Sequence, residues 1–173
     1  MLALLNPNAL TSERVDSFQV DERVAPDGHP DRNLTHFQEA LPDAALARMR
    51  PMPVLDPDLE SAAARYAALL PDSVDLVHLG IGPDGHTASL VPGDPVLEVR
   101  DRSVAVTAGE YQGRRRMTLT YPALEAAGRL LWLVTGADKR DALARMLAGD
   151  ASIPAGRVRA AEALVICDRE AAG

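Results

Sequence analysis

Residues 79–93 read LGIGPDGHTASLVPG and follow 74–79, an apolar stretch that predicts a buried strand with neither face in water. Three glycines early in this stretch let the backbone turn sharply and bring its N–H groups close to a ligand. Asp84 and His86 stand on this turn, two positions apart. An imidazole beside backbone donors has the parts for proton transfer next to an anion, so the turn predicts an enzyme site.

The rest of the chain alternates between strand-like and helix-like patterns, with 21–23 as a loop after the first strand. This alternation predicts an α/β fold, a mainly parallel, Rossmann-like sheet flanked by helices, with ligands at the carboxyl ends of its strands. No linker or repeat interrupts it, and we expect one domain over 1–173. Strands are expected at 15–20, 74–79, 103–107, 116–120, 130–134 and 164–167, and helices at 33–41 (capped by Asn33), 58–70, 122–127 and 137–147.

Composition narrows the class of protein. A formal net charge of −7 argues against nucleic acid as a partner, because that role needs a basic footprint. No stretch approaches about 18 consecutive apolar residues, so we expect no membrane-spanning helix. Residues 1–5 lack a basic flank and are broken by Asn6-Pro7, which is unlike a signal peptide. With a single cysteine, Cys167, the chain suits the cytoplasm.

Three further segments stand in order around the glycine-rich turn: VDERVAP at 20–26 with HPDRN at 29–33, RMTLT at 116–120 with PAL at 122–124, and LVTGADK at 133–139. Together with GPDGHTASLVPG at 82–93, they resemble the 6-phosphogluconolactonase family, the sugar-lactone hydrolases of the pentose phosphate pathway. The resemblance covers about residues 15–168.

One part of the family pattern has no counterpart here. Family members begin with an additional strand and a Gly-Gly-Ser-Thr-Pro-like loop that helps to hold the substrate phosphate, whereas 1–13 reads as the end of a helix and a loop. The resemblance therefore implies a chain truncated relative to the family and a sheet that is incomplete at its amino-terminal end.

The resemblance implies hydrolysis of 6-phospho-D-glucono-1,5-lactone to 6-phosphogluconate without metal or cofactor. His86 would act as general base on water, and backbone N–H groups of 80–85 or an arginine would stabilise the oxyanion. Asp84 has two interpretations that the sequence leaves open: it stabilises the turn, or it orients His86 and raises its basicity.

The family pattern also assigns substrate and phosphate contacts. Arg23 would contact the phosphate or the lactone, because a guanidinium grips phosphate as a fork, although a weak surface ion pair beside acidic neighbours is the alternative. Arg116 would bind an anion, although the basic run that it ends also suits a solvated loop. Lys139 opens a helix and would attract an anion or face solvent. The substrate-contact set is completed by Asp21, Gly82 and Gly85.

Other motifs point away from cofactors and metals. Gly80-x-Gly82-x-x-Gly85 matches the glycine pattern of dinucleotide-binding sites. Two features argue against such a site: Pro83 lies in the turn that the cofactor pyrophosphate would approach, and no acidic residue clearly ends a second strand. The four histidines show no paired metal-ligand spacing, and Cys167 has no basic neighbour that would make it a nucleophile. We expect the second loop to be shaped by His29, Asp31 and Asn33, and His36 and His78 to be structural.

Two other functional hypotheses stay open. One is a glucosamine-6-phosphate deaminase or sugar-phosphate isomerase of the same broad fold, although the deaminase turn continues with an Asn-Glu-Pro-like sequence and this chain continues with 87–92, TASLVP. The other is an inactive or partner-dependent lactonase remnant. The expected ligand is a sugar phosphate lactone, and the sequence does not distinguish a monomer from a weak oligomer.

Overall fold

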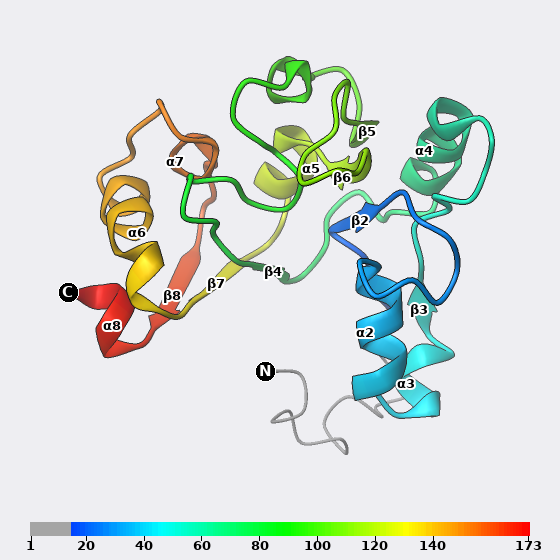
Figure 1. Ribbon diagram of the computed structural model, residues 1–173, viewed down its shortest axis with the longest axis horizontal. Helices are drawn as coiled ribbons and strands as arrows, with labels where there is room; N and C mark the ends of the chain where they lie inside the picture. Colours follow the sequence, from blue (N-terminus) through cyan, green and yellow to red (C-terminus); the bar gives the residue numbers. More distant parts are fainter. Residues whose placement is uncertain (1–14) are drawn as a thin grey trace.

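The computed structural model describes residues 15–173 (Figure 1), and the helix end and loop expected within 1–13 lie outside that range. Short strands alternate with short helices along it. The strands are β1 (Ser17–Phe18), β2 (Asp21–Arg23), β3 (Met49–Arg50), β4 (Val77–Leu79), β5 (Val104–Val106), β6 (Arg116–Leu119), β7 (Leu130–Val134) and β8 (Ala163–Cys167). The helices are α2 (Asn33–Ala40), α3 (Asp43–Leu46), α4 (Leu59–Ala67), α5 (Tyr121–Glu125), α6 (Arg140–Leu147), α7 (Pro154–Arg157) and α8 (Arg169–Ala172), with 3₁₀ turns η2 (Pro95–Glu98) and η3 (Ala137–Lys139).

Strand pairing is mostly parallel. β4, β7 and β8 form one parallel sheet in that order, and β1 pairs in parallel with β3. β2, β6 and β5 form a separate antiparallel sheet in that order. The predicted α/β class with mainly parallel pairing is therefore confirmed, and the antiparallel sheet is an addition that the sequence analysis did not predict.

The turn between β5 and β6 explains the antiparallel sheet. Gln112 (φ 54°) and Gly113 (φ 75°) both adopt left-handed backbone conformations, and Tyr111 N–H donates to the Arg114 carbonyl at 2.9 Å. Two successive positive φ angles give the tight turn that matches the twist of a hairpin. A parallel crossover needs about a dozen residues or more, so the 107–115 connection favours the antiparallel partner.

Two local predictions near the amino-terminal end are wrong. Residues 21–23 form β2 instead of a loop, because their backbone pairs with β6. Asn33 is the first helical residue of α2 and not its cap. The carboxylate of Glu22 accepts the N–H groups of Asn33 (2.8 Å) and Leu34 (2.9 Å), and so takes the place of a local cap.

The β4–β7–β8 sheet is less enclosed than the apolar sequence predicted. Val77 and Leu79 of β4 are buried, but His78 between them is exposed. On β8, Leu164 and Ile166 are exposed by about half (52% and 48%). The expectation of a strand with neither face in water is therefore wrong here, because the side chains that alternate away from the core meet solvent.

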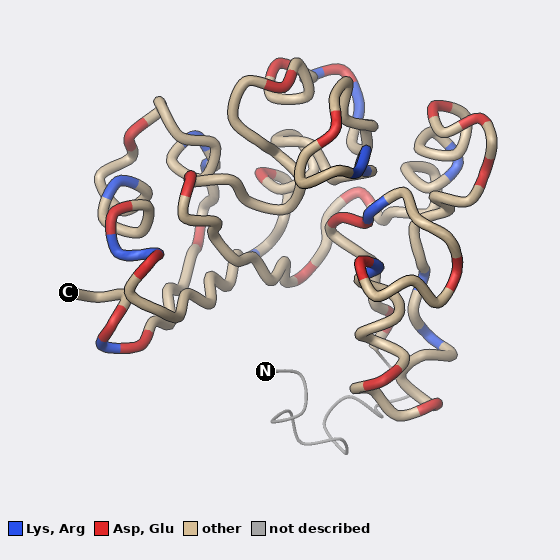
Figure 2. Tube along the Cα trace, viewed as in Figure 1, with Lys and Arg blue, Asp and Glu red and all other residues tan. Residues whose placement is uncertain are grey.

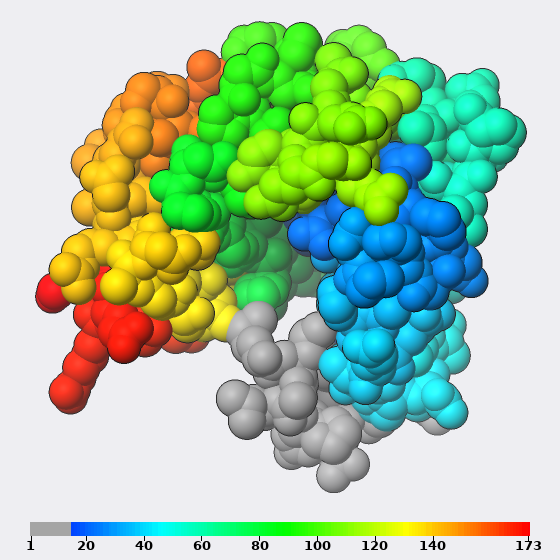
Figure 3. All heavy atoms as spheres, viewed as in Figure 1, coloured from blue at the N-terminus to red at the C-terminus, as the bar shows by residue number. Residues whose placement is uncertain are grey.

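A single connected set of buried apolar residues joins the sheets to their helices. α4 packs against β5, and α6 packs against α7 and α8. In Figure 3 the middle of the chain, coloured green, lies between the blue amino-terminal part and the yellow-to-red carboxyl-terminal part. Within residues 15–173, no helix combines the length and the apolar character that crossing a lipid bilayer requires.

Candidate active site

A cavity of about 240 Å³ lies where β2, the loop after β4, the start of α2 and the start of β6 meet. The predicted place of the ligand site, at the carboxyl ends of the strands of a mainly parallel sheet, is corrected in part, because β2 and β6 meet through antiparallel pairing. Of the predicted site residues, the cavity is lined by Asp21, Arg23, His86 and Arg116. Its other lining residues are Val20, Asn33, His78, Leu79, Gly80, Ile81 and Ala88.

A larger cavity of about 470 Å³ is lined from segments around 92–98 and 152–157, and it contains none of the predicted site residues. Its cation, Arg157, already pairs with Glu98 at 2.8 Å. The carboxylate of Asp94, also in its lining, accepts the N–H of Val96 at 2.8 Å. The charged groups of the larger cavity are thus already paired within the protein. The side chains suited to proton transfer and anion binding line the smaller cavity.

His86 and Asp84 form a close pair. Nδ1 of His86 lies 2.6 Å from Oδ1 of Asp84, which also accepts the His86 backbone N–H at 3.2 Å. The Asp84 carboxylate therefore stabilises the turn and also holds the His86 ring. The two interpretations of Asp84 are thus compatible with each other. With Nδ1 engaged, Nε2 is the ring nitrogen available for proton exchange in the cavity.

The charge of Asp84 is stabilised in this position. Burial acts to raise the pKa of Asp84, but hydrogen bonds from His86 and Tyr111 outweigh it and hold that pKa below its ordinary value. An ionised carboxylate beside the imidazole would stabilise the imidazolium that forms when His86 takes a proton.

Gly82 and Gly85 hold the turn that carries the Asp84–His86 pair, whereas Gly80 lines the cavity. Gly82 donates its N–H to the His86 carbonyl at 2.8 Å, and Gly85 (φ 82°) donates to the Gly82 carbonyl at 2.9 Å. A Cβ on Gly82 would overlap the His86 ring, and one on Gly85 would lie 2.6 Å from Cβ of Ile153. Both positions therefore need glycine, and within the described residues neither lines the cavity.

Replacing Gly82 with alanine is expected to displace the His86 ring and to lower turnover of the substrate at least tenfold, because the added methyl occupies the ring's place. Gly109→Ala is the matched control, since a Cβ there meets nothing closer than Asp94 Oδ2 at 3.7 Å. Steady-state kinetics of both variants checks this. Equal activity of Gly82→Ala and Gly109→Ala would contradict the placement of the ring.

Arg23 and Arg116 lie directly opposite one another in the β2–β6 register. Figure 2 shows the mixed acidic and basic run of β2 and the basic residues at the start of β6, the two segments that this pairing joins. Burial, followed by the positive charge of Arg23, lowers the pKa of Arg116. Two like charges at opposed positions are unfavourable, so an anion between them would be stabilised.

Backbone carbonyls fix both guanidinium groups. Arg23 Nη1 donates to the Asp31 carbonyl at 2.6 Å, and its buried Nε finds no hydrogen-bond partner within the described part of the chain. Arg116 donates from Nε and Nη2 to the Tyr111 carbonyl at 3.3 and 3.2 Å, and from Nη2 to the Gln112 side chain at 3.0 Å. The acceptors that hold the two arginines are neutral, and the carboxylates of Asp21 and Asp31 offset the effects of burial and of Arg23 on the pKa of Arg116 only in part.

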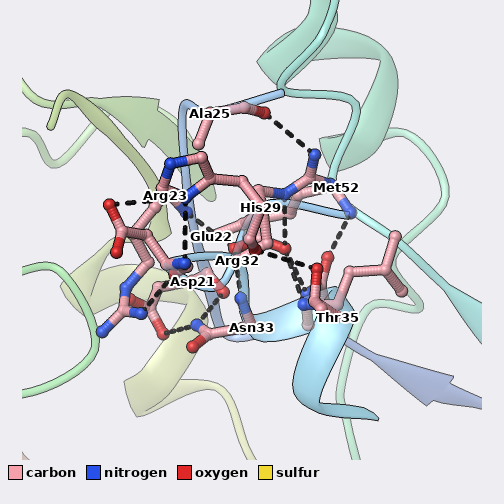
Figure 4. Close-up of polar contacts among 12 residues, drawn as sticks. Asp21, Glu22, Arg23, Ala25, His29, Arg32, Asn33, Thr35 and Met52 are labelled. Atoms are coloured by element: carbon pink, nitrogen blue, oxygen red, sulfur yellow. Dashed lines mark hydrogen bonds and ion pairs between the residues drawn. The ribbon is translucent and has the colours of Figure 1, made fainter. Parts of the chain in front are cut away.

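Asp21 is tied into the wall of the cavity (Figure 4). Its Oδ2 accepts from the Ser89 hydroxyl at 2.7 Å. Its Oδ1 accepts from the Asn33 amide at 3.2 Å, and Figure 4 shows these two residues side by side. The same amide also donates to the Asp21 carbonyl at 2.9 Å. Asp21 thus joins β2, the start of α2 and the loop after β4 at one point.

Beneath this wall, Glu22 is a fully buried carboxylate (0% exposed) at the centre of the contacts in Figure 4. It accepts the backbone N–H of Arg23 at 2.8 Å, those of Asn33 and Leu34, and the Gln19 amide at 3.0 Å. Arg32 Nε lies 3.0 Å from its Oε2, close enough for an ion pair although its N–H is not aligned as a hydrogen bond. Glu22 therefore sets where Arg23 and Asn33 stand.

Several predicted residues lie elsewhere. Lys139 pairs with Asp138 at 2.8 Å and, of the residues described, is not one that lines the cavity. His78, expected to be structural, lies at the cavity rim, where partial burial of its ring lowers its pKa although the residue as a whole is exposed. Cys167 is the last residue of β8 and is exposed.

The second loop is held from the β5–β6 connection. Asp31 accepts from Arg114 Nε at 3.0 Å, and His29 Nε2 lies 3.1 Å from Arg114 Nη2. These contacts agree with the expectation that His29, Asp31 and Asn33 shape this loop.

In residues 15–173 no group of three His, Cys, Asp or Glu side chains is placed to hold a metal ion.

Sequence reasoning missed four residues of the site: Glu22, Ser89, Tyr111 and Gln112. Glu22 lies within the segment 20–26, where its sequence neighbours indicate only an acidic residue beside Arg23. Tyr111 and Gln112 precede Gly113, and a short polar segment before a glycine is the signal that predicts a hairpin turn. No local pattern predicts that the Ser89 hydroxyl reaches Asp21.

Comparison with known proteins shows the family to which the chain belongs by sequence. The family model described as glucosamine-6-phosphate isomerases/6-phosphogluconolactonase matches residues 1–166. A 6-phosphogluconolactonase of Nostoc sp. is 36% identical over 152 residues, covering 80% of this chain and 62% of the relative. One of Streptomyces coelicolor is 36% identical over 167 residues, covering 86% and 64%. The chain thus spans a little less than two thirds of these relatives.

Solved structures show the same fold. The 6-phosphogluconolactonase of Thermotoga maritima superposes with a TM-score of 0.78 at 29% identity, over 90% of this chain and 73% of that one. A monomeric glucosamine-6-phosphate deaminase superposes with a TM-score of 0.83 over 99% of this chain and 79% of that one. Its identity is 20%, so it supports the fold alone.

Proposed function

Because the chain belongs to the glucosamine-6-phosphate isomerase/6-phosphogluconolactonase family, we propose that it hydrolyses 6-phospho-D-glucono-1,5-lactone to 6-phosphogluconate. One observation carries the proposal: His86, which is paired with Asp84, and the two opposed arginines line the same cavity. A base and an anion site side by side suit a substrate that carries both a reactive ester and a phosphate. In this proposal the chain acts as one domain in the cytoplasm on a small molecule.

In the proposed reaction, His86 Nε2 takes a proton from water as the water oxygen attacks the lactone carbonyl. The ionised Asp84 stabilises the imidazolium through Nδ1. The carbonyl becomes an oxyanion, which N–H groups of the glycine-rich turn or a guanidinium stabilise. The bond to the ring oxygen then breaks, and that oxygen receives the proton from His86. Water is consumed, and the product is the open acid.

Arg23 and Arg116 hold the phosphate in this proposal. Their opposed positions, the lowered pKa of Arg116 and the unpartnered Nε of Arg23 all favour an anion between them. Guanidinium groups bind phosphate as forks with defined geometry, which also orients the sugar ring toward His86. Lys139 keeps its predicted phosphate role only as a further hypothesis, because its ammonium is already paired with Asp138.

Arg116→Gln is expected to raise KM for the phosphorylated lactone about 10- to 100-fold, since a charge-assisted hydrogen bond contributes about 1.5–3 kcal/mol. The same variant should hydrolyse glucono-1,5-lactone, which lacks the phosphate, as the unchanged chain does. Arg115→Gln is the matched control, because Arg115 is the exposed neighbour in the same basic run. An equal loss with both lactones would show that Arg116 does not bind the phosphate.

The decisive experiment is turnover of fresh 6-phosphogluconolactone by this chain above the spontaneous rate, with glucosamine-6-phosphate assayed in parallel. Lactone turnover alone supports the proposal. Turnover of the amino sugar phosphate alone would support the deaminase alternative. A folded chain that turns over neither would favour the inactive or partner-dependent remnant and overturn the proposal.

A further inference from the structure

Tyr111 contacts both halves of the site without lining the cavity. Its hydroxyl lies 2.8 Å from Asp84 Oδ2 and 3.2 Å from His86 Nδ1, and its ring meets the His86 ring edge to face, with centroids 5.2 Å apart. Its backbone carbonyl accepts from Arg116. We propose that Tyr111 is a positioning residue, which orients Asp84 against His86 and, through its carbonyl, sets Arg116 beside them. This inference rests on the proposed role of His86 as the base.

The hydroxyl is placed to act as a donor to Asp84. An ionised carboxylate can only accept, and its other oxygen, Oδ1, is occupied by Nδ1 and the backbone N–H of His86. Burial, followed by the hydrogen bond to Asp84, raises the pKa of Tyr111 to about 12. The hydroxyl therefore keeps its proton at neutral pH and donates a hydrogen bond to Oδ2, the Asp84 oxygen that His86 does not contact.

The titratable and charged groups around the pair are few. Asp84 and His86 face each other within the turn, and Tyr111 and Arg116 approach from the β5–β6 hairpin. The Arg116 guanidinium carbon lies 5.0 Å from the centre of the Tyr111 ring, within range of a cation–π contact. Tyr111 thus stands between the positive charge and the Asp84–His86 pair, and its backbone is set by the tight turn at Gln112 and Gly113.

Tyr111→Phe separates these functions, because it removes the hydroxyl and keeps the ring and the carbonyl. Loss of one donor to the charged form should move the carboxyl titration of Asp84 to higher pH. With Oδ2 left without its donor, Asp84 is held only through Oδ1, so the base is less well oriented and we expect kcat to fall about tenfold or more. KM should change less than twofold, because within the described residues Tyr111 does not line the cavity.

Two measurements test this inference. The first is a carbon-13 NMR titration of the Asp84 carboxyl, assigned by Asp84→Asn, in the unchanged chain and in Tyr111→Phe. The second is kcat and KM of both proteins. Tyr121→Phe is the matched control, since the Tyr121 hydroxyl donates to the Pro154 carbonyl at 3.0 Å and not to a carboxylate. It should leave the Asp84 titration unchanged.

The outcomes separate this inference from the proposed function. An Asp84 titration that does not move in Tyr111→Phe overturns the inference, and so does an unchanged kcat when His86→Ala is inactive. Full activity of His86→Ala overturns the proposed role of His86 as the base, while the NMR titration still decides whether Tyr111 holds Asp84. Should Tyr111→Phe not fold, Asp84→Asn supplies the converse test, because it should lower the pKa of the Tyr111 phenol from about 12.

Discussion

Replacing His86 with alanine is expected to lower turnover of 6-phosphogluconolactone by a factor of about 10² to 10⁴, the contribution usual for a positioned general acid–base group. The reason is chemical rather than structural. His86 is partly exposed (21% of its side chain), and its ring contacts the side chains of Asp84 and Tyr111. We therefore expect the denaturant midpoint of His86→Ala to stay close to that of the unchanged chain, as measured by circular dichroism.

His36→Ala provides the matched control for this variant. His36 lies on α2 with 55% of its side chain exposed, near Glu39 at 3.7 Å, so it is a histidine outside the cavity. Its replacement should leave turnover unchanged. Because the lactone also opens spontaneously, rates are compared after the uncatalysed rate is subtracted. If a chain that turns over the lactone keeps its rate within twofold in His86→Ala, His86 is not the base.

The sequence predicted most of the fold because its signals are local. The apolar run 130–134 matches β7 residue for residue, and the helix expected at 137–147 is η3 followed by α6. Errors arose where a partner far along the chain decides the conformation. Residues 21–23 look like a charged loop on their own and become a strand only because β6 lies beside them. The backbone N–H of Asn33, at the start of α2, donates to Glu22, 11 residues earlier. No capping pattern at Asn33 predicts this hydrogen bond.

The same reasoning explains the site. Asp84 and His86 were identified because a short turn fixes both, so their spacing in sequence already implies contact. Arg23 and Arg116 came from the family resemblance, and it is the antiparallel register that places them opposite each other. Tyr111 reaches Asp84 from 27 residues away, and Ser89 reaches Asp21 from 68. Contacts of that kind depend on how the sheets pack, and composition or spacing cannot predict them.

Glu22→Gln is expected to lower the free energy of unfolding by about 3–5 kcal/mol, the usual cost of breaking a buried ion pair from one side. The glutamine keeps one oxygen, but its NH₂ group must face donors, since backbone N–H groups, an amide and a guanidinium surround the carboxylate. Buried donors left without an acceptor add to the loss. Urea unfolding of both proteins, with unchanged slope and a lower midpoint, measures the effect.

The pH dependence of stability should change in the same variant. Burial acts to raise the pKa of Glu22, but hydrogen bonds from Gln19 and from three backbone N–H groups hold it below its ordinary value of 4.5. A carboxyl with a depressed folded-state pKa contributes stability that is complete above the unfolded pKa. That stability is lost as pH falls through the lower folded value. Glu22→Gln removes this contribution, so its stability should fall less steeply in acid.

Glu39→Gln distinguishes this buried role from a general loss of negative charge, since Glu39 is on α2 with 71% of its side chain exposed. We expect it to change the free energy of unfolding by less than about 0.5 kcal/mol. Because Arg23 and Asn33 are positioned through Glu22, Glu22→Gln should also impair substrate binding, whereas His86→Ala should impair turnover with little change in stability. If Glu22→Gln were no less stable than Glu39→Gln, the positions of β2 and α2 would depend on other contacts, and Glu22 would not set the geometry of the cavity wall.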